Sequence, residues 1–175
     1  MTMDILIFLY LGFIVFKSSV HCQLLTYNIA HMTQLKSSSV LTYGGLNYST
    51  TNVIDGNPAT SPDACNCCWS SSDETNPWLE VTLPRHEHLV DIVLQGRTDQ
   101  TDEPRKLSGL NVQADGIAIP DKWIFVNSTH NFVSIDLQNQ PVKSIRINRP
   151  KMHDNYGAWF LIVCEVLINI QGMYT

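Results

Sequence analysis

The chain has 175 residues, of which 44% are hydrophobic and 15% charged, and its formal net charge is −5. This length suits one domain, and the composition is typical of a globular protein rather than a disordered one. The acidic balance argues against a broad surface for nucleic acid or for anionic membranes, because both need clustered positive charge. We therefore expect a single globular domain whose partners are not nucleic acids.

The N-terminus carries an unbroken apolar run from Ile5 to Phe16, followed by polar residues. The run is shorter than the about 20 residues that a transmembrane helix needs, so it is typical of a secretory signal peptide. We expect a signal peptide at 1–22, with Val20 and Cys22 at the small-residue positions before cleavage, and a secreted single domain at 23–175. An uncleaved membrane anchor is the alternative, because the stretch before the run contains Asp4 and no Lys or Arg.

Short runs of alternating apolar residues follow along the chain, with turn residues between them. A short helix or turn is predicted near 51–57, and a longer apolar run at 158–170 predicts a central strand buried on both faces. Strands that recur about every 10 residues indicate an all-β sandwich. The remaining predicted strands are 77–83, 89–96, 110–116, 122–127, 132–137 and 142–148.

Three cysteines crowd into the stretch DACNCCWSS at 63–71, and Cys164 lies far downstream. After removal of Cys22, the four remaining cysteines favour disulfides in an oxidising compartment, with three connectivities open. A thiol–metal or redox centre is the alternative, although zinc sites usually space their ligands as C-x₂₋₄-C pairs. Two N-x-S/T glycosylation sequons, at Asn47 and Asn127, also fit a secreted protein.

Two oxygen-rich segments suggest a cation site. The turn NVIDGN at 52–57 offers the Asp55 carboxylate in a tight bend, and Gly56 permits positive φ. Glu165 lies inside an apolar strand, where an unpaired carboxylate is costly to bury. One Ca²⁺ between the turn and Glu165 would satisfy both segments. The alternatives are a plain Asp-Gly turn and an exposed Glu on the outer face of the sheet.

The polar loop RTDQTDEPRK at 97–106 suggests a site for hydroxyl-rich sugars. We expect Asp99 to hold the Arg97 guanidinium in place, with Arg105 or Lys106 converging on the same point. A fixed guanidinium fork donates several hydrogen bonds in set directions. An ordinary solvated loop is the alternative. No nucleophile, base and orienting acid stand at recognisable spacing, so we do not expect an enzyme.

The order of these motifs resembles the F-type lectins (fucolectins), within the discoidin or coagulation-factor C-type domain group. The matching elements are NVIDGN, a cysteine-bearing loop, NPWLEVTL, a strand ending in RTD, then KLSG and a terminal CEV strand, over about Tyr27 to Ile170. The resemblance implies an eight-stranded jelly-roll sandwich, a structural Ca²⁺ and a shallow sugar site on the loops at one end. It implies as calcium ligands the main-chain oxygens of Asn52, Asn57 and Cys164, the carboxylates of Asp55 and Glu165, and the carbonyl of Ala64.

The resemblance also has departures at both sites. Ala64 stands where the family usually has a Ser, so one hydroxyl ligand is missing, and neighbouring Asp63 is a candidate replacement. Arg97 and Asp99 match the fucose motif, and Lys106 fits the second cation better than Arg105, because LSG follows it. The His that the family places in the cysteine loop is absent, which removes one donor to the sugar.

For the cysteines, we expect Cys65 to pair with Cys164 and to tie the loop to the terminal strand. Cys67 and Cys68 then form a vicinal disulfide or remain as thiols that link chains. The leading functional hypothesis is a secreted, calcium-dependent module that binds glycans, fucosylated ones among them, in innate recognition or adhesion. The alternative is a discoidin-like module for proteins or lipids that has lost fucose binding. A homo-oligomer is compatible with either.

Overall fold

The computed structural model describes residues 25–57, 59–99, 107, 109–119, 132–150 and 160–172. Several predictions fall outside these residues: the signal peptide, the strand at 122–127, Arg105, Lys106 and Asn127. Asn47, the other predicted glycosylation site, is described and exposed on β4. No helix within the described ranges has the length and apolar character needed to cross a membrane.

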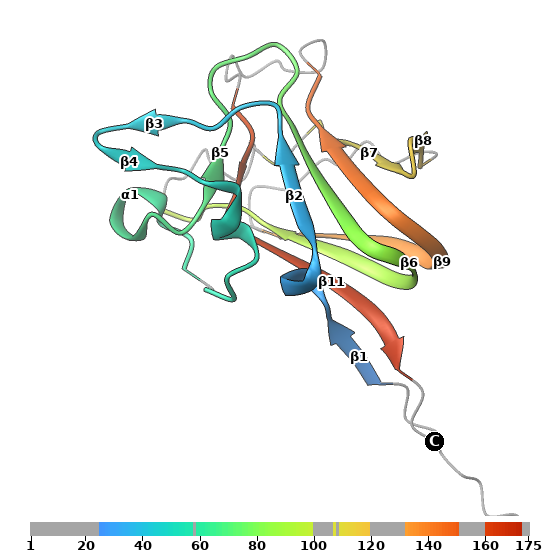
Figure 1. Cartoon of the computed structure of the whole chain (residues 1–175). Coiled ribbons are helices and arrows are strands. Elements are labelled where there is room, and N and C mark those ends of the chain that lie inside the picture. The colour runs from blue at the N-terminus through green and yellow to red at the C-terminus, as the bar shows by residue number, and fades with distance from the viewer. Residues whose placement is uncertain are drawn as a thin grey trace, which may run out of the picture.

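The described chain is nearly all β, with eleven strands, two 3-10 helices and one α-helical turn (Figure 1). The 3-10 helix η2 (Thr50–Val53) confirms the short helix or turn predicted near 51–57. In order, the other elements are β1 (Leu25–Asn28), η1 (Ala30–Met32), β2 (Gln34–Ser37), β3 (Thr42–Tyr43), β4 (Leu46–Asn47), α1 (Pro62–Cys65), β5 (Trp69–Ser70), β6 (Trp78–Gln95), β7 (Asn111–Ala114), β8 (Ile117–Ala118), β9 (Phe132–Asn148), β10 (Ile162–Val163) and β11 (Glu165–Gly172).

The two long strands, β6 and β9, each join two of the predicted strands into one. Both bend midway: the ladder between them shifts register between Thr82 and Glu87, and Gln138 and Asn139 of β9 have positive φ values of 55° and 56°. Pro84 lies at this bend, where a residue without an N–H donor is tolerated. Figure 1 shows both strands running to a sharp bend and returning. The strands were predicted correctly, but their continuity was not.

The bend converts one continuous sheet into the two layers of a β-sandwich. The first half of β6 pairs with β2 and with the second half of β9, which also pairs with β7. The second half of β6 pairs with β11 and with the first half of β9. One hydrophobic cluster includes Leu79 and Val81 from the first half of β6 and Ile92 and Leu94 from the second. The two halves therefore face a shared core. Six strands have four or more residues: β1, β2, β6, β7, β9 and β11. If the two halves of β6 and of β9 are counted separately, they make the eight strand segments expected of the sandwich.

The prediction of a single strand at 158–170 is wrong. The chain breaks at Cys164, whose N–H donates to the Gln95 carbonyl at 2.7 Å. Before the break, β10 pairs with β5 in a separate two-stranded sheet, and after it β11 joins the main sheet between β1 and β6. The segment is buried from Leu161 to Val166, as its apolar character predicted, because it passes from one sheet to the other through the interior.

Candidate functional site

Arg97 follows the end of β6, and its guanidinium is held by two carboxylates. Nε donates to Asp99 Oδ1 at 2.7 Å, and Nη2 donates to Asp99 Oδ2 at 2.8 Å and to Asp63 Oδ2 at 3.1 Å. The Arg97 side chain is only 8% exposed. Its hydrogen bonds to Asp99 are the main reason why the pKa of that carboxyl lies below its usual value. The expected contact between Arg97 and Asp99 is thus present, and Asp63 is an additional partner.

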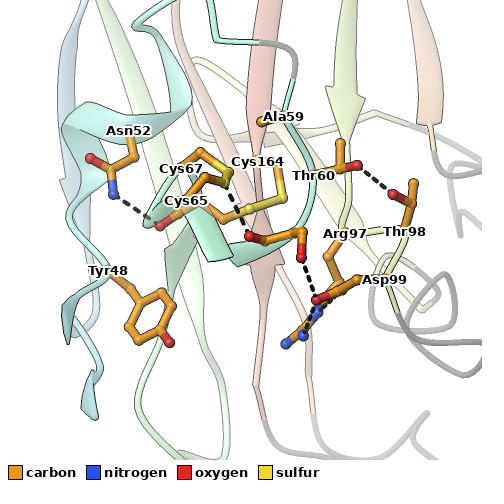
Figure 2. Close-up of a disulfide and its surroundings, with 12 residues drawn as sticks. Tyr48, Asn52, Ala59, Thr60, Cys65, Cys67, Arg97, Thr98, Asp99 and Cys164 are labelled. Carbon is orange, nitrogen blue, oxygen red and sulfur yellow. Dashed lines mark hydrogen bonds and ion pairs between the residues drawn. A yellow bond between two sulfur atoms is a disulfide. The ribbon is translucent and has the colours of Figure 1, made fainter. Parts of the chain in front are cut away.

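The segment at 60–63 is fastened to the segment at 97–99. The Thr98 N–H donates to the Thr60 carbonyl at 3.0 Å, and their two hydroxyls form a further hydrogen bond (Figure 2). The Ser61 hydroxyl donates to Asp99 Oδ2 at 3.0 Å. These bonds fix the start of α1, and therefore Asp63, beside Arg97.

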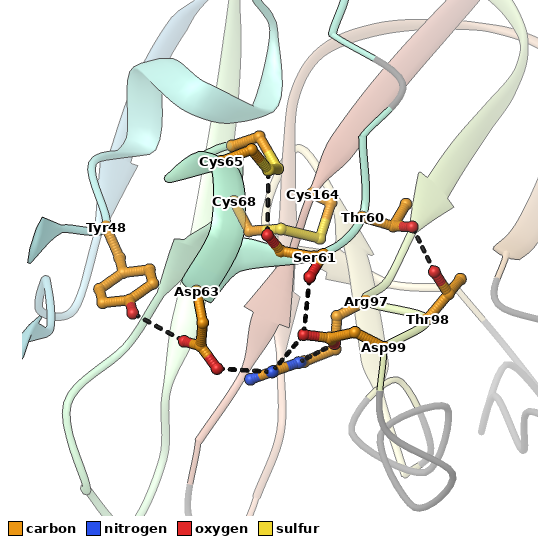
Figure 3. Close-up of polar contacts among 11 residues, drawn as sticks. Tyr48, Thr60, Ser61, Asp63, Cys65, Cys68, Arg97, Thr98, Asp99 and Cys164 are labelled. Carbon is orange, nitrogen blue, oxygen red and sulfur yellow. Dashed lines mark hydrogen bonds and ion pairs between the residues drawn. A yellow bond between two sulfur atoms is a disulfide. The ribbon is translucent and has the colours of Figure 1, made fainter.

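Tyr48, which directly follows β4, completes the polar cluster. Its hydroxyl donates to Asp63 Oδ1 at 3.0 Å, so Asp63 is held from both sides, as Figure 3 shows. Burial raises the pKa of Tyr48, and the hydrogen bond to Asp63 raises it further. Sequence reasoning missed Tyr48, and it considered Asp63 only as a metal ligand. No sequence signal marks either contact, because Tyr48 and Arg97 lie 15 and 34 residues from Asp63.

A cavity of about 200 Å³ opens on this cluster. Asp63, Arg97 and Tyr48 give it a polar side, while the rest of its wall is mostly apolar and aromatic. Such a mixture of apolar wall and few polar groups is typical of small-molecule sites. Its size suits a ligand on the scale of a single sugar ring. The other lining residues are Leu41, Tyr43, Pro62, Ser70, Phe160 and Ile162.

A second polar feature lies at the start of β11. Glu165 is 5% exposed, and its buried Oε2 has no hydrogen-bond partner among the residues that the structure describes. Burial raises the pKa of Glu165 to about 7, and the nearby Asp55 carboxylate adds to this shift, while a backbone hydrogen bond from Gly56 opposes it. The carboxylates of Glu165 and Asp55 thus lie close together, and a Glu165 oxygen lacks a hydrogen-bond partner among the described residues. This arrangement fits a bound cation.

The residues around Glu165 provide the hard oxygens that Ca²⁺ prefers. The turn at Asp55 is shaped by Gly56 at φ +73° and by a hydrogen bond from the Asn57 N–H to Asp55 Oδ1 at 2.8 Å. The Asn52 side chain donates to the carbonyls of Asn66 and Cys68, at 2.8 and 3.1 Å, and so ties η2 to the cysteine loop. Within the described part of the chain, no group of three or more His, Cys, Asp or Glu side chains could hold a metal ion. A cation here would therefore be held by two carboxylates and by main-chain oxygens.

Of the other predicted calcium ligands, Cys164 immediately precedes Glu165, whereas Ala64 is exposed on α1. Asp63 was the candidate replacement for the hydroxyl that Ala64 lacks. The structure places Asp63 at the cavity instead, where its oxygens accept hydrogen bonds from Tyr48 and Arg97, and its role as a metal ligand stays a prediction.

The predicted cysteine pairing is also wrong. Cys68 is bonded to Cys164, and Cys65 to Cys67. The reason lies in the β5–β10 ladder, where Trp69 is opposite Val163 and Ser70 opposite Ile162. Continuing this antiparallel register by one residue places Cys68 opposite Cys164, with their Cα atoms 3.8 Å apart. Cys65 lies on α1 and is not part of this ladder.

Because all four of these cysteines are in disulfides, a thiol–metal centre built on them is excluded. The Cys68–Cys164 bond also lies between the two polar features just described. Ile162, two residues before Cys164, lines the cavity, and Glu165 follows Cys164 directly. One short segment therefore connects the cavity with the carboxylate pair.

The fold is that of a discoidin-type β-sandwich. The family model for the F5/8 type C domain matches residues 34–165, and the chain belongs to this family. No curated protein sequence matches the chain.

Three solved structures illustrate the likeness. The lectin domain of lectinolysin, complexed with Lewis B antigen, is 19% identical with a TM-score of 0.68, and the match covers 83% of this chain and 98% of that one. A fucolectin from striped bass (Morone saxatilis) serum is 22% identical with a TM-score of 0.66, over 82% of this chain and 48% of that one. The family 32 carbohydrate-binding module of Clostridium perfringens NanJ, in complex with galactose, is 16% identical with a TM-score of 0.58, over 83% and 99%. At these identities the likeness shows the fold.

Proposed function

We propose that this protein is a secreted, non-enzymatic, calcium-dependent lectin that binds glycans, with fucosylated glycans as the leading candidates. The observation that carries the proposal is the cavity of about 200 Å³ built around the Arg97 guanidinium. Arg97 is nearly buried and fixed by two carboxylates, so its orientation is set before a ligand arrives. Fixed polar groups beside an apolar wall suit a sugar ring, which has hydroxyls at its edge and apolar C–H faces.

The structural neighbours support this choice of ligand. Of the three solved structures described above, two are complexed with Lewis B antigen and with galactose, and the third is a fucolectin. Secretion is supported by the two disulfides, since such bonds persist mainly in oxidising compartments.

Calcium is proposed to stabilise the sugar site rather than to contact the sugar. Asp55 and Glu165 would hold the cation, together with the main-chain oxygens of Asn52, Asn57 and Cys164. The turn containing Asp55 leads within a few residues to Thr60 and Ser61, which fix the cavity beside Thr98 and Asp99. When bound, the cation would supply the positive charge that the two carboxylates need.

The test is a glycan array, run on the wild type and on Arg97→Gln in calcium and in EDTA. We expect the wild type to bind a subset of glycans in calcium and to bind them more weakly in EDTA. Arg97→Gln should abolish binding while its circular dichroism spectrum stays that of the wild type. Asp73→Asn, a change at an exposed position outside the cavity lining, is the control. A wild type that binds no glycan at any calcium concentration would refute the lectin proposal.

A protein or lipid ligand is the second candidate, and one observation favours it. Tyr43 is 73% exposed at the rim of the cavity, on the hairpin formed by β3 and β4. The turn of this hairpin contains Gly44 and Gly45 at φ +60° and +83°, which suits a tight two-residue hairpin loop. An exposed aromatic side chain on a fixed hairpin is also a means of contacting a protein or a bilayer. Binding to a protein ligand that is not inhibited by free sugars would favour this candidate.

A further inference from the structure

Asp63 has an unusual position in the cavity. Its side chain is 59% exposed, although it is in contact with a nearly buried arginine. Both of its oxygens already accept one hydrogen bond: Oδ1 from the Tyr48 hydroxyl at 3.0 Å and Oδ2 from Arg97 Nη2 at 3.1 Å. The carboxylate is therefore held still, yet it faces solvent in the space that a ligand would enter.

The carboxylate can accept more hydrogen bonds than these two. An ionised carboxylate has two oxygens with about four lone-pair directions in all. Tyr48 and Arg97 occupy one direction on each oxygen, so one further acceptor direction remains on each. Two acceptors on one rigid group match a pair of hydroxyls on adjacent ring carbons of a sugar.

The donors that contact Asp63 are already directed at carboxylates. The Tyr48 hydroxyl proton points at Asp63, and the Nε and Nη2 protons of Arg97 are donated to Asp99 and Asp63. At Asp63, a ligand must therefore bring the donors itself. A hydroxyl does so without adding charge, whereas a carboxylate or sulfate on the ligand would repel Asp63.

The rest of the wall limits how a sugar can approach this carboxylate. Leu41, Ile162 and Phe160 line the cavity together with Asp63, and they offer apolar surface but no side-chain hydrogen-bonding group. A sugar ring can place a C–H face on this surface only while its hydroxyl edge faces the polar side. This division of the cavity sets which edge of the ring meets Asp63.

We infer that Asp63 is a ligand-binding residue that accepts hydrogen bonds from two adjacent hydroxyls of an uncharged sugar, and that it thereby determines specificity. The inference rests on the proposed function, since it assigns the acceptor at that same site. It differs from a purely structural role, in which Asp63 would only position Arg97.

The test measures the coupling between Asp63 and individual hydroxyls by titration calorimetry in calcium. The probes are methyl fucoside, methyl galactoside and, for each, the analogues that lack one ring hydroxyl. The proteins are the wild type, Asp63→Asn, Asp63→Ala and the control Asp73→Asn. We expect Asp63→Ala to weaken binding of the parent glycoside about 10- to 100-fold, the range for a lost hydrogen bond to a charged group. Asp63→Asn, which keeps one acceptor oxygen, should lie between Asp63→Ala and the wild type.

The decisive result is the pattern among the analogues. In the wild type, loss of either of two adjacent hydroxyls should weaken binding about tenfold or more, and in Asp63→Ala the same losses should have little further effect. If Asp63→Ala weakens every analogue by the same factor, Asp63 only positions Arg97 and the inference is wrong, while the lectin proposal stands. If Asp63→Ala binds as tightly as the wild type, the inference is wrong as well. If the wild type binds neither parent glycoside nor any glycan on the array, both proposals fail.

Discussion

Glu165 should make the calcium-free protein less stable as the pH rises. Its side chain is buried, and its pKa is raised from an ordinary 4.5 to about 7, first by burial and then by the nearby Asp55 carboxylate. The folded state therefore holds a proton that the unfolded chain releases at lower pH. The contribution to stability is fully present below pH 4.5 and is lost between pH 4.5 and about 7, with no further loss above.

The size of the loss follows from the shift in pKa. One pKa unit corresponds to about 1.36 kcal/mol, so this shift corresponds to roughly 3 kcal/mol of unfolding free energy. For a domain of this size, roughly 3 kcal/mol corresponds to a fall in Tm of roughly 6–12 °C. A cation bound beside Glu165 and Asp55 would reverse the loss, because it stabilises the charged form that burial disfavours.

The assay is thermal unfolding in EDTA from pH 4 to 8, for the wild type and for Glu165→Gln. Gln mimics the protonated form, so Glu165→Gln should be the more stable protein at pH 8 in EDTA, and the difference should vanish near pH 4. Comparing the two proteins cancels other titrations, such as that of Asp99, whose lowered pKa acts in the opposite sense at acid pH. Added Ca²⁺ should raise the Tm of the wild type at pH 8 and leave Glu165→Gln nearly unchanged.

Glu87→Gln is the matched control, because Glu87 pairs with the exposed Arg85 at the surface and should contribute little. The reasoning is refuted if the wild type and Glu165→Gln show the same pH dependence in EDTA. A calcium response that persists in Glu165→Gln would refute the cation site at this position while leaving the burial argument intact.

Three further predictions concern the core and the cavity. Replacing both Cys68 and Cys164 with Ala should lower the free energy of unfolding by about 4–5 kcal/mol, because the disulfide joins residues 96 apart in the sequence. Chemical denaturation would measure this loss, and a loss below about 1 kcal/mol would contradict the chain-entropy argument. Ile92→Ala should cost about 2–5 kcal/mol in the same measurement, since the side chain is fully buried, and an unchanged midpoint would contradict its place in the core. Tyr48→Phe removes the hydroxyl that holds Asp63 and should weaken glycan binding several-fold with a change in Tm of only a few degrees; unaltered affinity would show that Asp63 does not need this partner.

The sandwich was predictable because, in most of its strands, the apolar residues that alternate in the sequence are the ones that are buried in the structure. The predictions failed where a strand bends or changes sheets. The two halves of β6 were predicted as separate strands because Pro84 and the polar residues after it resemble a turn, yet they form a bend inside one ladder. The segment at 158–170 is apolar except for Glu165 and Asn169, and this pattern did not reveal that the chain leaves one sheet for the other at Cys164.

The candidate site was only half predictable, for a similar reason. Arg97 and Asp99 are two residues apart, and their opposite charges make the contact foreseeable. Asp63 reaches Arg97 only because the segment at 60–61 is hydrogen-bonded to residues 98–99, which follow β6, and Tyr48 reaches Asp63 only because β4 ends beside α1. The same holds for the disulfides, since the register of two-residue strands cannot be inferred from so short a pattern.

The position of β11 has a consequence for how the protein is made. This strand comes last among the described elements, yet it lies between β1 and β6 in the main sheet. While the chain emerges from the ribosome, the second half of β6 lacks its partner on that side, and β1 lacks its only partner among the described strands. Non-local pairing of this kind is slow and exposes unpaired strand edges. Productive folding should therefore wait until residues 165–172 have emerged from the ribosome. The disulfide between Cys68 and Cys164 should form equally late, because Cys164 directly precedes these residues.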